Sequence, residues 1–310
     1  LPTGGSTKNA GFACIGSLTE ILADLQTMPP AAVLQLAGMR LAGLRLLRSR
    51  LGDDRIGYRE NGSFELVGEG QEAALQQMDS VNEMLGSLFN GRPAFTPANE
   101  YIRPFGFNPQ QVKFLVRNNF EGELHTGKMM RALIDTAIAR GVEIKTGCRV
   151  SGIDDFHTGV NVMVPHHTLQ ENIVFTASKA LVCTNAFTRQ LLPEEDVTPG
   201  RGQVLLTAPI TNLPFRGIFH MEEGYYYFRE LDGRVLLGGG RQLDFAGETS
   251  ADFKFNNRIQ QELEVLLRTV ILPGREVSVD GRWTGIMAFG KTRQPIVKAH
   301  TKNVIMGVRM

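Results

Sequence analysis

Apolar residues recur at helical spacing in several long segments of the chain. Between residues 28 and 51 they follow the pair Pro29-Pro30, which is typical of a helix start, and they predict helices there. Residues 128–140 place their apolar side chains on one face, as an amphipathic helix does. The segments 71–89 and 251–272 show the same spacing and are also predicted to be helical.

Strand-like runs occupy much of the remaining sequence. Residues 57–62 are typical of a hairpin turn and residues 63–67 of a strand, while residues 142–145 predict a strand directly after the helix at 128–140. Further short strands are expected at 160–164, 172–175, 180–183, 203–207, 225–228 and 234–237. The predicted class is mixed α and β, with helix–strand units in one region and antiparallel strands in another.

Composition limits the classes of partner. With 310 residues, of which 42% are hydrophobic, the chain can bury the core of two domains or of one large discontinuous unit. A formal net charge of +1 provides no field that gathers nucleic acid, so a small-molecule partner is favoured over a nucleic acid. No apolar run reaches the ~20 residues that a membrane span requires, so no span is expected.

Cysteine and histidine spacing gives no sign of a metal site. Cys14, Cys148 and Cys183 lie far apart without a C-x-x-C pair, which predicts neither a disulfide framework nor a zinc site. The histidines show no spacing that brings two ring nitrogens to one metal. This usage favours a reducing, cytoplasmic location.

Two glycine motifs resemble nucleotide-binding signatures but lack the required context. Residues 68–73 fit G-x-G-x-x-A, yet no buried strand with an acid about 20 residues further on follows them. Glu65, at the centre of the preceding strand, suits an exposed antiparallel strand better than a buried parallel one. Residues 122–128 spell the P-loop pattern, but Met129 stands where a Ser or Thr must bind magnesium. The arginines between residues 40 and 50 could form a phosphate-binding stripe, but a solvated helix face is the favoured interpretation.

A third glycine-rich stretch, residues 2–11, reads Pro-Thr-Gly-Gly-Ser-Thr-Lys-Asn-Ala-Gly. It resembles the loop after the first βαβ unit of the D-amino-acid oxidase and glycine oxidase family, which packs along FAD. Further loose matches to that family follow in order at residues 124–144, 148–150, 182–186, 199–203, 226–238, 283–285 and 307–309. Together they cover nearly the whole chain, so the sequence is identified as a suspected member of this family.

The resemblance implies an incomplete Rossmann-like FAD-binding domain that is discontinuous, with an inserted substrate domain built on an antiparallel sheet. The FAD-binding domain is expected at residues 1–55, 123–200 and 280–310, and the substrate domain at 56–122 and 201–279. Because the chain starts on Leu1 and stops in a strand-like run, we expect a fragment whose G-x-G-x-x-G lies upstream and whose C-terminal end is missing.

The chemistry that the resemblance implies is hydride transfer from the α-carbon of a small amino acid or amine to the flavin, with O₂ or an electron carrier as the final acceptor. A carboxylate substrate needs a fixed planar cation, and Arg309 matches that position, with a buried structural ion pair as the alternative. Tyr226 matches the active-site tyrosine whose hydroxyl bonds the carboxylate. A slip of one residue would select Tyr225 or Tyr227 instead.

One position departs from the family pattern. Met287 stands where relatives often carry a second arginine, and Arg282 could substitute for it or be a plain surface residue. The residues expected along FAD are Ser6, Thr7, Lys8, Asn9, Ala10, Gly11, Val150, Thr184 and Asn185.

Two other functions are compatible with the sequence. The same fold could act on a sarcosine-like secondary amine or on an aminomethyl group of tRNA, although the near-neutral charge argues against tRNA. Alternatively, the chain could be a truncated, non-catalytic fragment that binds no FAD.

Overall fold

The computed structural model describes residues 4–309 except 167, 169 and 170. The chain forms two compact units, each assembled from three segments. Unit 1 comprises Leu1–Thr136, Gly202–Phe245 and Lys254–Gly285, and unit 2 comprises Ala137–Arg201, Ala246–Phe253 and Ile286–Met310. The organisation is therefore discontinuous, as expected. The predicted FAD and substrate domains stay a prediction, because packing alone divides the chain at other positions.

An eight-stranded sheet dominates the structure. Its strands, in spatial order, are β14 (Val279–Phe289), β10 (Thr198–Thr207), β13 (Arg234–Gly239), β12 (Tyr226–Leu231), β11 (Ile218–Met221), β2 (Ser63–Val67), β4 (Phe114–Asn118) and β3 (Phe95–Pro97). The neighbours β11 and β2 run parallel, whereas the pairs from β10 to β11 and from β2 to β3 are antiparallel. The expected antiparallel-sheet region is thus present.

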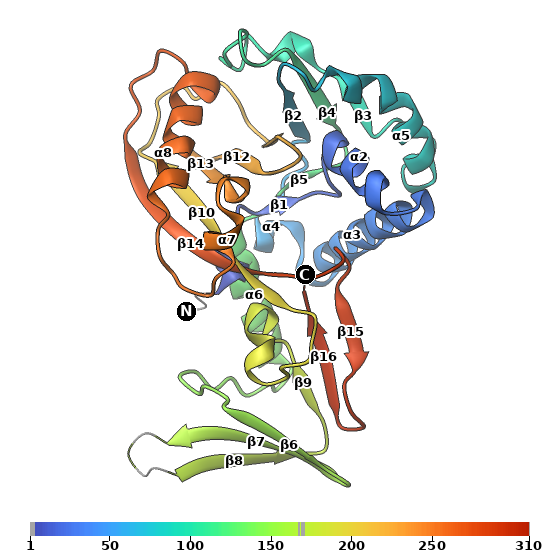
Figure 1. Cartoon of the computed structure of the whole chain (residues 1–310), viewed down its shortest axis with the longest axis vertical. Coiled ribbons are helices and arrows are strands. Elements are labelled where there is room, and N and C mark those ends of the chain that lie inside the picture. The colour runs from blue at the N-terminus through green and yellow to red at the C-terminus, as the bar shows by residue number, and fades with distance from the viewer. Residues whose placement is uncertain (1–3, 167, 169–170, 310) are drawn as a thin grey trace. The chain divides into compact units, whose positions relative to one another are not determined.

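Side chains alternate between the two faces of this sheet. Different helices pack against each face (Figure 1). Helix α8 (Asn257–Leu266) covers one face, where Phe219 and Phe228 stack with ring centroids 4.5 Å apart. Helices α2 (Leu18–Thr27), α3 (Pro30–Leu51) and α5 (Met78–Leu85) pack against β2, β3 and β4 on the other face. We call this second face, which carries Glu65, His220, Tyr227 and Arg229, the loop face.

The predicted helices at 28–51 are confirmed, with local reasons for their boundaries. Pro30 occupies the first turn of α3, and Gly52 ends the helix with φ +82°. A capping box starts the preceding α2: the Ser17 hydroxyl accepts from the Glu20 backbone N–H, and the Glu20 carboxylate accepts from the Ser17 N–H.

Two elements of the structure differ from those predicted from the sequence. The helix predicted at 71–89 is broken into a 3-10 segment (Glu72–Gln77), α5 and a second 3-10 segment (Gly86–Leu88), consistent with the low helix propensity of Gly86. Residues 142–145 do not form a strand. In the described part of the chain no strand pairs with them, and the side chains of Val142 and Ile144 are 53% and 47% exposed. An apolar run without a neighbouring strand has no ladder to join.

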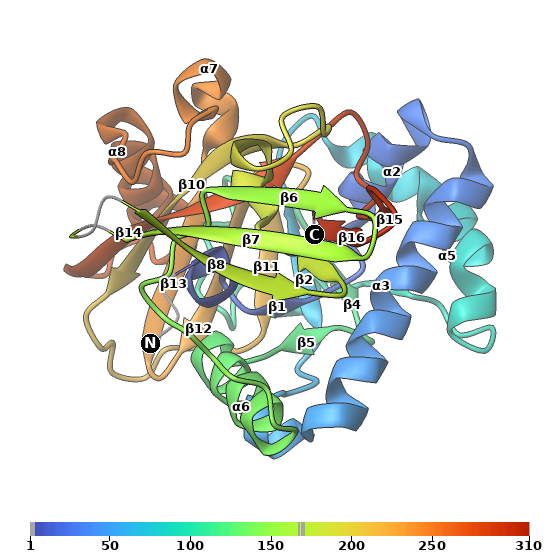
Figure 2. The ribbon, with the colours of Figure 1, turned by 90° about the horizontal axis from the view of Figure 1, so that it is seen from below.

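Unit 2 contains two three-stranded sheets. The strands β6 (Gly152–Phe156), β7 (Gly159–His166) and β8 (Glu171–Ala177) form an antiparallel meander (Figure 2). In the other sheet, β16 (Val304–Val308) lies between antiparallel β15 (Ile296–Ala299) and parallel β9 (Ala180–Val182). A buried core of Val182, Val304 and Met306 supports this second sheet.

Short elements complete the chain. They are α1 (Gly5–Lys8), β1 (Phe12–Ala13), α4 (Asp53–Ile56), β5 (Gly122–Glu123), α6 (Thr126–Ala139) and α7 (Phe245–Glu248). Strand β1 pairs with β5 in a two-stranded antiparallel sheet. Among the described residues, no helix combines the length and apolarity needed to cross a membrane.

Candidate functional site

The glycine-rich segment of residues 5–11, here called the N-terminal loop, is closed by its own side chains. The Asn9 side-chain amide donates to the carbonyl oxygens of Gly5 and Ser6 at 3.1 and 3.0 Å. Its Oδ1 accepts from the Gly11 N–H at 2.9 Å. The Thr7 hydroxyl donates to the Gly4 carbonyl, while Ser6 is exposed. Asn9 and Thr7 thus shape the loop, and Ser6 remains accessible to a ligand.

Two strands of the large sheet hold this loop from the loop face. Trp283 on β14 donates its indole N–H to the carbonyl oxygen of Lys8 at 2.9 Å. Arg229 on β12 donates to the carbonyl oxygens of Ala10 and Gly11 at 3.2 and 3.3 Å. A segment near the start of the chain is therefore fixed by residues more than 200 positions away.

Directly after the loop, Phe12 packs on an aromatic pair of the loop face. Its ring meets the rings of His220 and Tyr227 edge-on, with centroids 5.2 and 5.8 Å apart. The Tyr227 ring lies across Gly238 of the neighbouring strand, where an added Cβ would come within 2.6 Å of it. His220 is 4% exposed, burial lowers its pKa, and its Nε2 has no hydrogen-bond partner among the residues that the structure describes. A neutral imidazole is therefore favoured here.

Glu65 lies buried beside the start of α2, contrary to the expectation of an exposed strand residue. It is 3% exposed and accepts hydrogen bonds from the Ser17 hydroxyl at 2.8 Å, the Thr19 N–H at 3.2 Å and the Thr19 hydroxyl. Burial raises its pKa, and these three donors oppose that rise. Glu65 can be buried because these three donors replace the hydrogen bonds to water that its carboxylate loses.

Glu121 is a second buried carboxyl in the same region. It accepts from the Ile15 N–H at 2.6 Å and from the Ser63 hydroxyl. Burial raises its pKa to about 7, and the hydrogen bond from Ser63 acts in the opposite direction. The group can therefore change its protonation state near neutral pH.

Tyr226 and Tyr227 point to opposite faces of the sheet, as strand neighbours must. Tyr226 is 2% exposed and lies in the core on the α8 side, close to Gly240 and Ile259. Burial raises the pKa of each tyrosine to about 12, and in Tyr226 a hydrogen bond with Gln242 partly opposes this. Both hydroxyls are thus protonated at neutral pH and can donate a hydrogen bond.

Arg309 lies in unit 2 and is 8% exposed. Its Nη1 donates to Asp196 Oδ2 at 2.6 Å, its Nη2 to the Thr292 hydroxyl at 2.7 Å, and its Nε to the Gln294 carbonyl at 3.0 Å. Each guanidinium nitrogen therefore has a partner within the chain. This arrangement matches the alternative of a structural ion pair, and the assignment to a substrate carboxylate stays a prediction.

The other expected residues of unit 2 belong partly to the same cluster. Asn185 Oδ1 accepts from the Arg309 backbone N–H at 2.8 Å, and the hydroxyls of Thr184 and Thr188 lie 3.1 Å apart. Val150 is half-buried and lies outside any strand. The structure brings Thr184, Asn185 and Arg309 together but does not by itself assign them to a cofactor.

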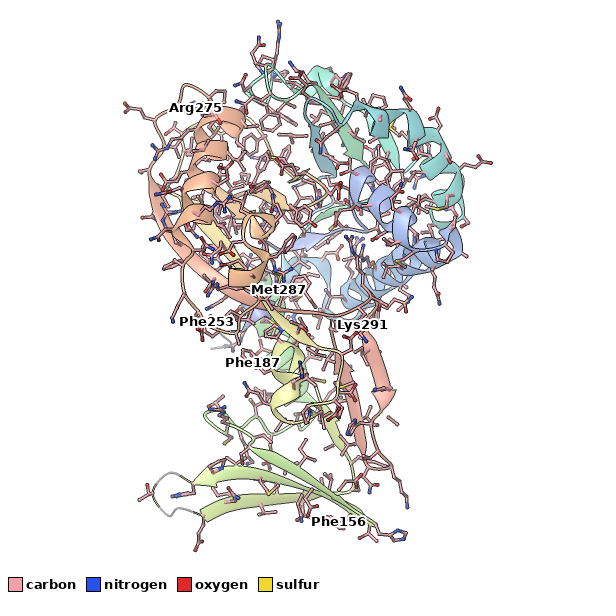
Figure 3. All side chains as sticks on the ribbon, viewed as in Figure 1. Phe156, Phe187, Phe253, Arg275, Met287 and Lys291 are labelled. Carbon is pink, nitrogen blue, oxygen red and sulfur yellow. The ribbon has the colours of Figure 1, made fainter. Side chains whose placement is uncertain are left out.

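The second expected cation lies elsewhere. Arg282 donates to Gln260 and Glu264 of α8, on the face opposite the loop face. Met287, which stands where relatives often carry an arginine, is 40% exposed and is labelled in Figure 3. Arg282 is therefore held by α8, and its role as a substitute for the second arginine of the family stays a prediction.

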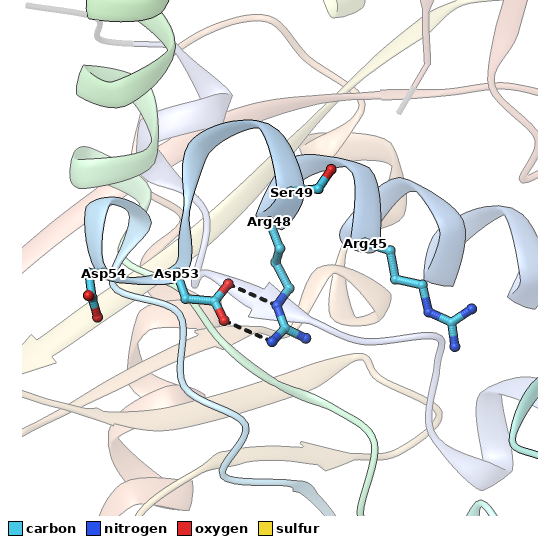
Figure 4. A pocket seen from close by; sticks show the side chains of 5 residues that line it. All are labelled: Arg45, Arg48, Ser49, Asp53 and Asp54. Carbon is cyan, nitrogen blue, oxygen red and sulfur yellow. Dashed lines mark hydrogen bonds and ion pairs between the residues drawn. The ribbon is translucent and has the colours of Figure 1, made fainter.

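Two arginines of α3, Arg40 and Arg48, have partners within the chain, whereas Arg45 and Arg50 are exposed. A cavity of about 450 Å³ lies at the C-terminal end of α3. Arg48 in its lining donates to both oxygens of Asp53 at 2.9 and 2.8 Å (Figure 4). Arg40 donates to the Ile15 carbonyl at 2.6 Å. Acidic partners neutralise Arg48, which argues against a phosphate-binding stripe.

The N-terminal loop suits the cofactor that the sequence resemblance implies. Ser6 is an exposed hydroxyl and Lys8 adds a positive charge. An added Cβ at Gly4 would meet no atom of the described residues within 4 Å. Hydroxyl, ammonium and open glycine backbone are the chemistry that phosphate and ribityl groups require. The residues present therefore fit an FAD-binding role.

Comparisons with known proteins agree with this chemistry. A family model described as FAD dependent oxidoreductase matches residues 1–309. The fold is similar to glycine oxidase from Geobacillus kaustophilus (TM-score 0.75, 16% identity, 99% of this chain and 79% of that one). It is also similar to iminodiacetate oxidase from Chelativorans sp. BNC1 (TM-score 0.72, 18% identity, 100% of this chain and 81% of that one). A third similar structure is L-proline dehydrogenase from P. horikoshii (TM-score 0.73, 12% identity, 99% of this chain and 78% of that one). A search of curated protein sequences gave no match.

Sequence reasoning missed several residues that shape this site, namely Phe12, Glu121, His220 and Arg229. Arg229 carried a usable signal, because a charged residue within the run of strand residues 226–231 needs a partner if it is buried. Glu121 and His220 carried none, since their burial depends on segments about 100 residues or more away.

Proposed function

Because the chain belongs to the family of FAD-dependent oxidoreductases, we propose that it oxidises a small amino acid or amine at the carbon that bears the nitrogen. FAD supplies the acceptor for the hydride removed from that carbon. The chain binds the cofactor, orients the substrate and excludes water. The observation that carries the proposal is the N-terminal loop, which presents Ser6 and Lys8 and is fixed to the sheet by Trp283 and Arg229.

The cofactor-binding residues in this proposal are those that the sequence resemblance implies. Ser6 and Lys8 hold polar groups of FAD, while Thr7, Asn9, Ala10 and Gly11 give the loop its shape. Val150, Thr184 and Asn185 complete the set. A loop whose shape is fixed before binding loses less conformational entropy when the ligand arrives.

The residues that orient the substrate are assigned to one edge of the sheet, where β12 begins and the neighbouring β13 ends. Tyr226 presents a protonated hydroxyl beside Gln242. Arg241, next in the chain to Gln242, lies with its guanidinium carbon 5.2 Å from the ring centre of Phe245 and brings a cation to the same strand end. A hydroxyl donor and a guanidinium together suit a carboxylate. Arg309 contributes a direct contact only if the substrate displaces Asp196 from it.

A secondary-amine substrate is the second candidate, and the names of two similar structures favour it. The cations at the expected positions bear instead on how tightly a carboxylate is held, because proline and iminodiacetate also carry carboxylates. Met287 carries no charge, Arg282 is bound to α8, and Arg309 is bound to Asp196. These three positions therefore offer no uncommitted cation for a strong carboxylate clamp. Proline and iminodiacetate, named for two of the similar structures, are secondary amines.

The test is the visible absorption spectrum of the protein produced from its complete coding sequence. We expect a flavin spectrum that bleaches anaerobically with at least one of glycine, sarcosine, proline or a D-amino acid. Bleaching by sarcosine or proline but not by primary amino acids would select the second candidate. A protein that remains colourless and cannot be reconstituted with FAD would overturn the proposal and favour a non-catalytic protein.

A further inference from the structure

Arg229 occupies an unusual position for a charged residue. It lies on β12 in the middle of the large sheet and is only 5% exposed. Burial lowers its pKa, and the nearby Glu123 carboxylate, 3.5 Å from its Nε, acts in the opposite direction. A buried guanidinium costs stability unless its donors are satisfied, so its partners indicate what it does.

Those partners are backbone carbonyl oxygens of two other segments. Nη1 lies 3.2, 3.3 and 2.9 Å from the carbonyl oxygens of Ala10, Gly11 and Leu124, and Nε donates to the Glu230 carbonyl at 3.1 Å. One side chain thus joins the end of the N-terminal loop, the segment after β5 and its own strand.

The backbone around this contact is tightly packed. Gly11 has φ +75°, and a Cβ there would overlap the Leu124 carbonyl oxygen and come within 2.9 Å of Arg229 Nη1. The Gly11 carbonyl also accepts from the Leu124 N–H at 2.8 Å. The loop can therefore end in this conformation only because glycine leaves room for the guanidinium.

We propose that Arg229 is a positioning residue that sets the affinity for FAD by holding Ala10 and Gly11 against the sheet. The inference rests on the proposed function, in which the loop binds the cofactor. In this role Arg229 acts on the cofactor through the loop backbone that it holds. Lysine keeps the charge but cannot satisfy the Glu230 carbonyl and the loop carbonyls at once, because it lacks the planar fork of arginine.

The test compares Arg229→Lys and Arg229→Met with Arg234→Met in the full-length holoenzyme. Arg234 is a matched control because it lies on the adjacent strand and forms a partly exposed ion pair with Asp280 outside the loop contact. FAD is removed from each protein, and the dissociation constant for added FAD, the apoprotein melting temperature and the hydrogen exchange of residues 5–11 are measured.

We expect both Arg229 variants to bind FAD at least about tenfold more weakly, with faster exchange confined to the loop and near-normal kcat at saturating FAD. The control keeps the affinity of the unmodified protein. Folded Arg229 variants with unchanged FAD affinity would overturn the inference while leaving the proposed function intact. Failure of both variants to fold even at saturating FAD would also overturn it, since a loop-positioning residue leaves the two units intact. If the unmodified protein itself has no affinity for FAD, the proposed function is wrong.

Discussion

The backbone N–H of Arg309 donates to Asn185 Oδ1 at 2.8 Å, and both residues have positive φ angles, +63° and +44°. Left-handed backbone is costly for residues other than glycine and persists where the surroundings enforce it. Here the enforcing contacts are those of the Arg309 guanidinium with Asp196, Thr292 and Gln294. The two expected site residues thus depend on each other for their conformation.

Replacing Arg309 by methionine should therefore destabilise the protein whatever the substrate. We expect the free energy of unfolding to fall by about 1–3 kcal/mol, because several charge-assisted hydrogen bonds are lost while Asp196 remains partly solvated. Urea unfolding measures the change. The control is Arg268→Met, an exposed residue in an i,i+4 pair, with an expected change within about 0.5 kcal/mol. An unchanged stability together with a lost carboxylate preference would show that the guanidinium serves the substrate.

Tyr226 and Tyr227 of β12 allow a matched test of which face of the sheet binds the substrate. Tyr226→Phe should raise KM for a carboxylate substrate about tenfold with a smaller effect on kcat, because one hydrogen bond to a charged group is lost. Tyr227→Phe removes a hydroxyl of the same raised pKa from the opposite face and should leave KM unchanged. Steady-state kinetics with both variants decides the question. The reverse result would move the substrate to the loop face and establish the one-residue slip.

Gly11 should be intolerant of any side chain. Alanine there combines a left-handed backbone with an overlap on the Leu124 carbonyl, so we expect a loss of about 2–5 kcal/mol in unfolding free energy. Gly70→Ala separates the two effects, since Gly70 has φ +84° but no atom within 4 Å of an added Cβ. It should cost only about 1–2 kcal/mol. Equal losses in denaturant unfolding would mean that the close approach at Gly11 does not matter.

The sequence predicts elements whose signals are local and misses those that depend on distant partners. Helix α3 follows from its own apolar spacing and from Pro30, and β2 from its apolar run. The burial of Glu65 could not be predicted, because its donors lie 46 and 48 residues earlier. Likewise, the face of Tyr226 depends on the register Tyr226↔Gly239, and a strand pattern of three tyrosines leaves that register open.

Glu121 should make stability fall as pH rises. Its pKa is raised from 4.5 to about 7 by burial, so between these values the folded protein binds more protons than the unfolded chain. The free energy of unfolding should therefore drop by about 3 kcal/mol across this interval from this group alone. Glu65, whose pKa is also raised by burial, acts in the same direction.

Glu121→Gln tests this directly, because an uncharged amide of the same shape can still accept from Ile15 and bond Ser63. We expect the variant to lose most of that pH dependence and to be at least as stable as the parent at pH 8, measured by urea unfolding across the pH range. Glu69→Gln, at an exposed position, should retain the parent's slope. If Glu121→Gln keeps the full slope, the titrating group lies elsewhere, and the buried carboxyl is already ionised at the lower pH.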